Sequence, residues 1–323
     1  MTKNEIIIRK VVREMGGIIK RLIPERSFSC IEINGHRIFV TQKFSIADSL
    51  FSRNDSTDSK DITYNLLKEA GISTPKTVGI YKKNFNRKKL VKKLNTLSYP
   101  VIIKDANGSH SRGVFANIKN RKEAENIIAQ EINNFPCLIV QEMIFGKEYR
   151  VLILGKRVIG ALEMIPPRIF GNGKNTVRDL IKDKQTKTEK QTPFDKSLSE
   201  ILRKQGETLN SIPQKNKEIF LRHNSCLAEG GEVKDVTNSV NKDIKLKCVE
   251  VNKIVGRYLS GVDIICDDIR KSLSEQKFFI IELNRKPDVY IHYKPTHGKT
   301  RNVVKDILKF ALRVKEKEKS ITY

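Results

Sequence analysis

Tryptophan is absent from this chain of 323 residues, and aromatic residues make up only 7% of it. No basic segment is interleaved with aromatic side chains, the pattern of domains that stack nucleic-acid bases. No apolar run approaches the roughly 20 residues of a membrane-spanning helix. The apolar stretch within residues 1–8 is too short for a secretory signal peptide. These absences disfavour a membrane protein and a base-stacking module.

Cysteine is also scarce, with five scattered residues and no C-x-x-C pair: Cys30, Cys137, Cys226, Cys248 and Cys266. This spacing indicates neither a zinc site nor a disulfide framework. We therefore expect a protein of the reducing cytoplasm.

Acidic residues are few relative to basic ones: the chain has 37 Asp and Glu but 62 Lys and Arg, which gives a net charge of +25. Such a field attracts polyanions, so nucleic acid, an acidic peptide, or a nucleotide with an acidic substrate are possible partners. The alternative is a solvated lysine-rich surface, which the dispersed lysines of 82–93 and 182–190 favour. Nucleic acid remains open but is not favoured.

The apolar pattern predicts an α+β protein without internal repeats and without a regular βαβ series. A hairpin is expected at 27–44, where Asn34-Gly35 is typical of a type I′ turn. Further strands are expected at 77–81, 100–104, 113–118, 137–141, 149–154, 157–162 and 278–283. Helices are expected at 62–70, 87–97, 121–132, 176–182 and 301–317. Residues 52–61 read as a linker, and the polar residues 183–196 as a flexible insertion.

A first polar cluster follows a buried strand: Lys104 precedes a small-residue loop at 107–113. Backbone N–H groups of such a loop can close on phosphates, while Lys104, His110 and Arg112 supply cations. No G-K-[ST] follows the glycines, so this is not a Walker A loop. Taken alone, it could equally be an ordinary turn.

A second cluster runs from Val140 to Arg150. The end of a strand and its short apolar link could pair an adenine edge through the backbone, with Glu148 accepting from ribose hydroxyls. Arg150 would point from a strand into the cleft. An ordinary surface hairpin is the alternative.

A third cluster offers oxygen ligands. Glu282 and Asn284 are two residues apart on a strand and so project from one face. Together with Asp263 they form a hard donor set that suits Mg²⁺. An isolated E-x-N triplet is, however, often a surface feature.

A fourth cluster surrounds the di-glycine turn at 230–231. Arg222 and Asn224 precede this turn, which can present backbone donors to a developing oxyanion. A tight structural loop is the alternative.

In their shared order these clusters resemble the ATP-grasp superfamily, and more closely the ATP-grasp regions of cyanophycin synthetases and bifunctional glutathione synthetases. The resemblance covers about residues 58–310. The matching stretches are DSKDITYNLLKEAGISTPK, YPVIIKDANGSHSRGV, VQEMIFGKEYRVLIL, FGNGKNTVRDLI, LRHNSCLAEGGEVKDVT, GVDII, IIELNRKP and THGKTRNV. It implies an ATP-grasp fold with a short N-terminal region at 1–57, a small lobe at 58–140 and a large lobe at 141–323.

The resemblance also implies roles for single residues. Lys60 and Lys104 would contact adenine and the α- and β-phosphates, and Asp263, Glu282 and Asn284 would hold Mg²⁺, with Mn²⁺ as an alternative. The mobile phosphate lid would consist of Gly108, Ser109, His110, Ser111, Arg112 and Gly113. Gln141, Glu142, Met143 and Ile144 would line the adenine pocket, with Glu148 on the ribose. Arg222, Asn224 and Arg150 would steady an acyl-phosphate, and Arg301 is a further candidate.

The implied reaction is ATP-dependent formation of an amide or peptide bond through an acyl-phosphate, with release of ADP and phosphate. The substrate would be an amino acid or peptide. We expect an anionic one, because basic residues gather where the substrate loops should be: Arg168, Lys174, Arg285, Lys286, Lys294, Lys299 and Arg301. A homo-oligomer is compatible with the sequence. A kinase or thioester ligase with the same nucleotide site is one alternative. A basic protein that binds nucleic acid or another anionic partner, with a degenerate site, is the other.

Three departures from the family pattern concern the lid and the substrate side. Ser111 stands where the family loop has a second glycine. Glu163-Met164 replace basic residues ahead of a proline, with Arg168 following, and Arg285-Lys286-Pro287-Asp288 replace the usual small-small-Pro-Gly. The chain also lacks the long N-terminal region of cyanophycin synthetases and their C-terminal Mur-ligase-like half, so we do not expect cyanophycin synthesis.

Overall fold

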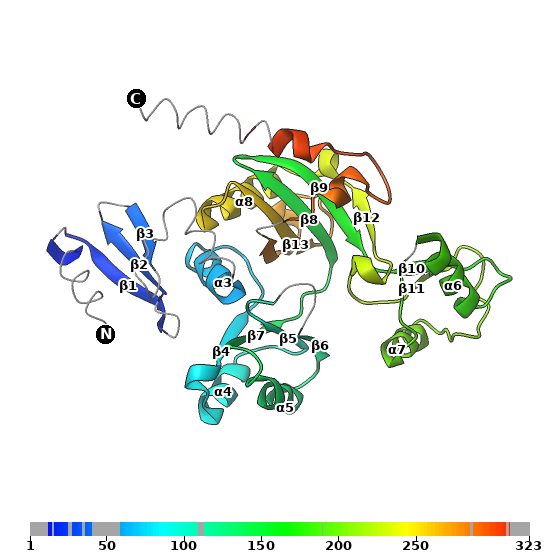
Figure 1. The fold of residues 1–323 in the computed structure, drawn as a ribbon, viewed down its shortest axis with the longest axis horizontal. Coiled ribbons are helices and arrows are strands. Elements are labelled where there is room, and N and C mark those ends of the chain that lie inside the picture. Colours follow the sequence, from blue (N-terminus) through cyan, green and yellow to red (C-terminus); the bar gives the residue numbers. More distant parts are fainter. Residues whose placement is uncertain are drawn as a thin grey trace.

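A computed structural model describes residues 12–14, 16–24, 28–33, 36–40, 59–108, 113–188, 190–284, 287–307 and 310. The described strands form four sheets, of five, four, three and two strands. Helices pack against the two larger sheets, which lie on either side of helix α3 (Lys60–Glu69) (Figure 1). The predicted mixture of helices and antiparallel sheets is confirmed.

The four-stranded sheet has the order β4-β7-β5-β6. Its strands are β4 (Thr77–Tyr81), β7 (Cys137–Glu142), β5 (Val101–Asp105) and β6 (Val114–Ile118). Helices α4 (Arg87–Leu94) and α5 (Arg121–Glu131) cover one face, and each begins at an asparagine whose side chain accepts a backbone N–H. Val101, Ile103, Leu138 and Val140 point to this face and form its core with both helices. The other face of the sheet therefore remains for Lys104 and Gln141.

The five-stranded sheet has the order β12-β9-β8-β13-β14. Its strands are β12 (Glu232–Asp235), β9 (Arg157–Ile165), β8 (Lys147–Leu154), β13 (Leu259–Cys266) and β14 (Phe278–Asn284). Helix α8 (Lys242–Val255) packs on one face and ends at Gly256, whose φ of 74° is readily adopted by glycine. Alternate residues of β8 and β13, including Tyr149, Val151 and Val262, join this core. Their neighbours consequently project from the opposite face.

A small separate unit projects from the large sheet between β9 and β12. It consists of strands β10 (Arg168–Phe170) and β11 (Glu218–Phe220) with helices α6 (Val177–Thr188) and α7 (Lys196–Lys204). Ile169 and Ile219 bury one face of the two-stranded ribbon against both helices. The expected flexible insertion at 183–196 is wrong in its first part, because α6 continues through Thr188. Val177 and Ile181 bury the apolar side of this helix, while its remaining turns are polar.

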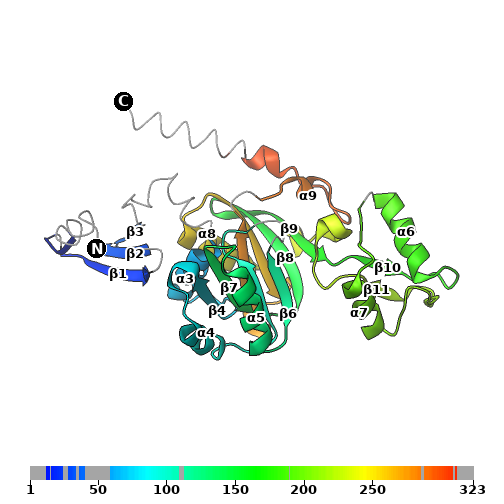
Figure 2. The same cartoon turned by 60° about the horizontal axis from the view of Figure 1, so that its bottom comes forward.

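The N-terminal sheet consists of β1 (Ile18–Ile23), β2 (Phe28–Ile33) and β3 (His36–Val40). The two strands of the predicted hairpin are confirmed, whereas its turn at 34–35 lies outside the described residues. Both views place this sheet and the α6–α7 unit at opposite ends of the molecule (Figure 2).

Short helical segments complete the described chain. They are η2 (Lys82–Asn84), η3 (Leu227–Glu229), η4 (Thr237–Ser239), η5 (Leu273–Glu275) and α9 (Tyr290–Tyr293). Of the helix expected at 301–317, residues 303–307 are helical, and most of the remainder is outside the described ranges. Among the described helices, none is long and apolar enough to cross a membrane.

Candidate active site

Five of the predicted site residues lie on one face of the large sheet. Arg150 on β8 is opposite Asp263 on β13, and Asp263 is opposite Glu282 on β14. Glu148 and Asn284 are each two residues from a member of this row, so they share its face. The register thus brings together residues that are more than 100 positions apart in the sequence. The opposite face is buried against α8.

Arg150 and Asp263 form a two-bond ion pair on this face. The guanidinium donates from Nε to Oδ1 at 2.7 Å and from Nη2 to Oδ2 at 2.8 Å. The amide of Asn284 donates to the same Oδ2 at 2.9 Å. The charge of Asp263 raises the pKa of Arg150 above its ordinary value, despite burial. Asp263 therefore fixes the orientation of the Arg150 side chain.

Glu148 is held by the side chain of Ser225, which lies outside the predicted site residues. The hydroxyl of Ser225 donates to its Oε2, and Ser225 directly follows Asn224. Burial and the nearby charge of Asp263 raise the pKa of Glu148. Ser225 belongs to the quoted stretch LRHNS, but nothing in that pattern marks its hydroxyl as a partner of β8.

The side chains of Asp263, Glu282 and Asn284 carry the kind of oxygen atoms that magnesium prefers as ligands. Two carboxylates and one carboxamide lie at neighbouring positions of β13 and β14, although the Asn284 amide N–H and the Arg150 guanidinium both face Asp263 here. All are hard oxygen donors, and two like charges side by side are favoured by a cation between them. Lys60 supplies part of that positive charge, with Nζ 3.4 Å from Oε1 of Glu282.

Helix α3 places Lys60 at the junction of the two sheets. Besides its ion pair with Glu282, the Lys60 ammonium donates to the backbone carbonyl of Gly108, at the start of the predicted phosphate loop. Its backbone N–H donates to the carbonyl of Ala106 at 2.9 Å. Lys60 thus contacts both the small-sheet loop and the predicted metal strand.

Lys104 lies on the inner face of the four-stranded sheet. Its side chain is buried beside Tyr64 of α3, with Nζ 3.4 Å from the phenol oxygen and 5.7 Å from the ring centroid. Burial alone would lower the pKa of Lys104. The neighbouring Tyr64, Glu282 and Asp263 outweigh that effect and raise the pKa, so the ammonium stays charged at neutral pH.

The predicted phosphate loop is described only at its two ends. Gly108 accepts the Lys60 bond, and Gly113 has a φ of 65°. This positive φ favours glycine at position 113, and a Cβ there would also lie 2.9 Å from the ring of Phe135, which would have to shift. Ser109, His110, Ser111 and Arg112 lie outside the described residues.

The predicted adenine segment, Gln141–Ile144, joins the two large sheets. Gln141 is buried and donates to Thr77 Oγ1 at 2.9 Å, whereas the Glu142 carboxylate accepts from the backbone N–H of Ser98 at 2.7 Å. Met143 donates its N–H to the carbonyl of Pro100 at 3.0 Å. These contacts fix the segment in place. Ile144 follows them, just beyond the end of β7.

Arg222 occupies a different environment from the one expected for an acyl-phosphate ligand. It is buried, and its guanidinium donates to Glu229 at 2.6 Å, to Asp195 at 3.0 Å and to the carbonyl of Pro193 at 2.9 Å. These bonds fasten the segment before α7 to the chain after β11. Asn224 is exposed. The structure therefore places Arg222 in an ion-pair network with Glu229 and Asp195, three residues before the Ser225 that donates to Glu148.

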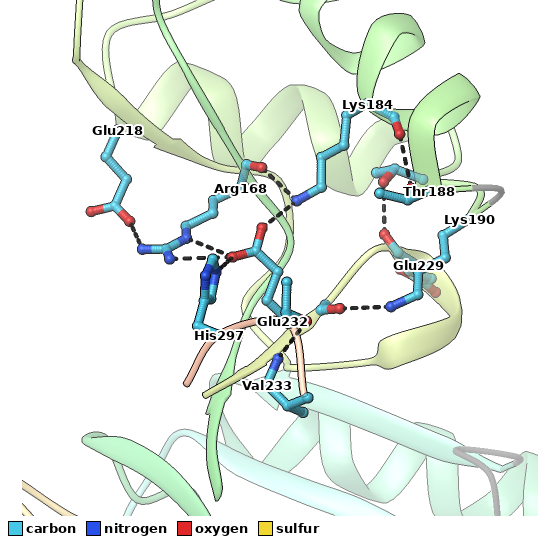
Figure 3. Close-up of polar contacts among 12 residues, drawn as sticks. Arg168, Lys184, Thr188, Lys190, Glu218, Glu229, Glu232, Val233 and His297 are labelled. Atoms are coloured by element: carbon cyan, nitrogen blue, oxygen red, sulfur yellow. Dashed lines mark hydrogen bonds and ion pairs between the residues drawn. The ribbon is translucent and has the colours of Figure 1, made fainter. Parts of the chain in front are cut away.

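Arg168, one basic residue of the expected substrate side, meets Lys184 and His297 at a single carboxylate, that of Glu232 on β12 (Figure 3). Arg168 Nη2 lies 3.2 Å from it, Lys184 Nζ 2.7 Å and His297 Nε2 3.0 Å. Burial would raise the pKa of Glu232, but its bonds to Lys184 and His297 and the nearby cations lower it. This cluster attaches the α6–α7 unit to the large sheet, so Arg168 is bound to protein groups.

The other basic residues of that side divide into paired and exposed ones. Arg301 is paired with Asp235 at 2.8 Å. Lys174, Lys294 and Lys299 are exposed, while Arg285 and Lys286 lie outside the described residues. Among the described residues of this side, the two arginines are thus engaged in ion pairs within the fold, whereas the three lysines are exposed.

Comparison with known proteins identifies the domain. Residues 57–170 match the RimK-like ATP-grasp domain. The chain is 31% identical to a cyanophycin synthetase of Nostoc over 214 residues, 64% of this chain and 24% of that protein. It is 29% identical to the bifunctional glutathione biosynthesis protein GshAB of Clostridium perfringens over 267 residues, 78% of this chain and 33% of the relative. The chain thus spans about a quarter to a third of the length of these relatives.

Solved structures share the fold at low sequence identity. A bifunctional glutathione synthetase from Pasteurella multocida superposes with a TM-score of 0.57 and 23% identity, covering 92% of this chain and 42% of the other. A D-alanine–D-alanine ligase from Bacillus anthracis has a TM-score of 0.50 and 14% identity, covering 83% and 71%. The chain therefore has the ATP-grasp fold, and its residues 57–170 are similar to the RimK-like ATP-grasp domain.

Proposed function

We propose that this chain is an ATP-dependent ligase that joins a carboxylate to an amine through an acyl-phosphate, releasing ADP and phosphate. One observation carries the proposal: Lys60 and Lys104 meet the row of Asp263, Glu282 and Asn284 where the two sheets adjoin. Cations for phosphates and oxygen donors for a divalent metal are the two halves of a nucleotide-triphosphate site. Relatives whose names denote synthetases and ligases support the same chemistry.

In this mechanism ATP lies between the two sheets, with its adenine against the segment Gln141–Ile144 and its ribose toward Glu148. Lys60 and Lys104 bind the α- and β-phosphates, and the loop from Gly108 to Gly113 covers them. Asp263, Glu282 and Asn284 would hold Mg²⁺, or Mn²⁺ in its place, which neutralises charge on the phosphate oxygens. The lobe boundary near residue 140 separates these two groups of ligands.

The reacting groups meet beyond the phosphates. A substrate carboxylate oxygen attacks the γ-phosphorus, the bond to the β-γ bridging oxygen breaks, and ADP leaves. The fixed guanidinium of Arg150 faces the charge that develops on the transferred group, and its orientation by Asp263 avoids reorganisation during the reaction. An amine nitrogen then attacks the acyl carbon, phosphate leaves, and the amine loses a proton.

We further propose an anionic amino acid or peptide as the substrate. The net charge of +25 and the exposed Lys174, Lys294 and Lys299 on the substrate side favour such a ligand. Arg222, bound within the fold, would act by holding the loop that carries Asn224 and Ser225. The five scattered cysteines, with no C-x-x-C pair among them, fit a reducing, cytoplasmic environment.

The proposal is tested by ADP release. The wild-type protein would be incubated with ATP, Mg²⁺ and pooled amino acids and peptides, and the products analysed by mass spectrometry. We expect ADP release that depends on both a carboxylate and an amine, and a product with the mass of their amide. Release that depends on a hydroxyl or a thiol instead would identify a kinase or a thioester ligase. Salt-sensitive binding of RNA or DNA without ATP turnover would favour the nucleic-acid-binding alternative.

A further inference from the structure

Tyr64 is a buried tyrosine in the middle of the proposed nucleotide site, and no predicted role includes it. It lies on α3, one helical turn after Lys60, so both side chains face the junction of the two sheets. Its ring packs with Ala106, Cys137 and Ile139 on the inner face of the small sheet. Its hydroxyl therefore ends between Lys104 of that sheet and strand β14 of the other.

The hydroxyl has only one proton, and two acceptor oxygens lie within reach of it, of which the Ile281 carbonyl is the nearer. The Tyr64 hydroxyl donates to the backbone carbonyl of Ile281, the residue directly before Glu282. That leaves the oxygen lone pairs to accept from Lys104, whose Nζ lies 3.4 Å away. A second group, the Gln141 side-chain oxygen, is 3.5 Å from the hydroxyl.

The Ile281 carbonyl is available because β14 is irregular at this point. Asp263 pairs with Glu282 and the next residue, Ile264, pairs with Ile280, so Ile281 has no opposite residue on β13. Such a bulge leaves one residue outside the regular pairing and redirects the strand. The bulge thus lies between the regularly paired residues Phe278–Ile280 of β14 and the two predicted metal ligands of this strand, Glu282 and Asn284.

We propose that the Tyr64 hydroxyl is a positioning group that holds the Lys104 ammonium toward the nucleotide phosphates and ties it to the metal strand at Ile281. This inference rests on the proposed function, since it assigns Lys104 to the phosphates. Lys104 is 6% exposed, so water is largely excluded from its ammonium and a protein acceptor must orient it. Without the Tyr64 hydroxyl, the Lys104 ammonium would lose the acceptor that orients it. It would then stabilise the charge on the phosphates less well, because a fixed cation needs no reorganisation.

The test is Tyr64→Phe, which keeps the ring and removes only the hydroxyl. Tyr81→Phe is the matched control, because Tyr81 also packs against this cluster but its hydroxyl donates to Asp61 at 2.9 Å. ATP binding would be titrated for both variants, with the melting temperature measured in parallel. We expect Tyr64→Phe to weaken ATP binding about tenfold, the scale for one hydrogen bond to a charged group. Tyr81→Phe should bind ATP as the wild-type protein does.

A double-mutant cycle separates positioning from general support of the fold. In the Lys104→Met background, Tyr64→Phe should have little further effect, because the group that it positions is gone. An undiminished effect in that background, or wild-type affinity in the single variant, would overturn the inference. A wild-type protein that binds no ATP would instead refute the proposed function.

Discussion

Arg150 and Asp263 lie directly opposite each other on β8 and β13 and share two hydrogen bonds, of 2.7 and 2.8 Å. The arginine was expected to contact the acyl-phosphate and the aspartate to bind metal. The pair shows that the two groups are physically linked. A change at either residue should therefore alter the environment of the other.

The first prediction concerns this ion pair and stability. Asp263→Ala should lower the free energy of unfolding by about 3–5 kcal/mol, because it leaves the largely buried Arg150 charge without a partner. Glu282→Ala should cost much less, since Glu282 is more exposed and its Lys60 contact is longer. Urea denaturation of both variants provides the comparison. Equal losses would show that the Arg150–Asp263 pair is not a special element of the fold.

The second prediction concerns the metal ligands and turnover. Glu282→Ala or Asn284→Ala should abolish ATP consumption while the circular dichroism spectrum stays that of the wild-type protein. The reason is that the transferred phosphoryl group would lose the metal that neutralises it. Near-normal ADP release by the Glu282→Ala protein would rule out the magnesium assignment.

The sequence predicts the parts of this site that depend on neighbouring residues, but not those that depend on contacts between distant segments. The two-residue spacing of Glu282 and Asn284 correctly placed both side chains on one face, because strand alternation is a local property. The pairing of Arg150 with Asp263 depends on which strands become neighbours, and no local pattern carries that information. The same holds for Tyr64, which reads from the sequence as one more apolar residue of a helix.

Helix α6 illustrates the opposite error. Its second half is rich in Lys, Thr and Gln, and the absence of apolar periodicity favoured a loop. In the structure, Lys184 on this helix donates to Glu232 and to the carbonyl of Arg168, at 2.7 Å each. Polar tertiary contacts stabilise this part of the helix, and a hydrophobic pattern cannot report them.

The third prediction concerns His292 and the pH dependence of stability. This imidazole is fully buried against Gly160, and its ring nitrogens have no hydrogen-bond partner among the described residues. Burial and the nearby Arg150 lower its pKa to about 4, although Asp235 and Asp288 oppose this shift. Between pH 6.5 and 4 the unfolded chain therefore binds the proton that the folded protein refuses, and stability should fall as the pH falls.

Two variants test this origin of the pH dependence. His292→Gln and His292→Leu should each flatten the decline of unfolding free energy between these pH values, whatever their stability at neutral pH. The part of the decline that disappears in these variants should be on the order of 3 kcal/mol, because each unit of pKa shift corresponds to about 1.4 kcal/mol of unfolding free energy. An unchanged slope in both variants would mean that other groups cause the acid sensitivity.

The fourth prediction concerns the surplus positive charge. Reversing Lys294 and Lys299 to Glu should raise the KM for the anionic substrate, whereas reversing Lys182 and Lys187 on α6 should not. All four lysines are exposed, so the pairs differ mainly in their position relative to the site. The Debye length is about 8 Å at physiological salt, so distant charges contribute little. If neither pair of reversals changes KM, the substrate is not selected by charge.

The central claim is that a substrate carboxylate is activated by phosphorylation, and isotope transfer tests it most directly. Candidate carboxylates labelled with oxygen-18 would be incubated with the protein, ATP, Mg²⁺ and the amine that completes the reaction. Each amide bond formed should leave one labelled oxygen in the released phosphate, because the carboxylate oxygen that attacked the γ-phosphorus departs with it. Amide formation accompanied by unlabelled phosphate, or by AMP and pyrophosphate, would contradict the acyl-phosphate mechanism.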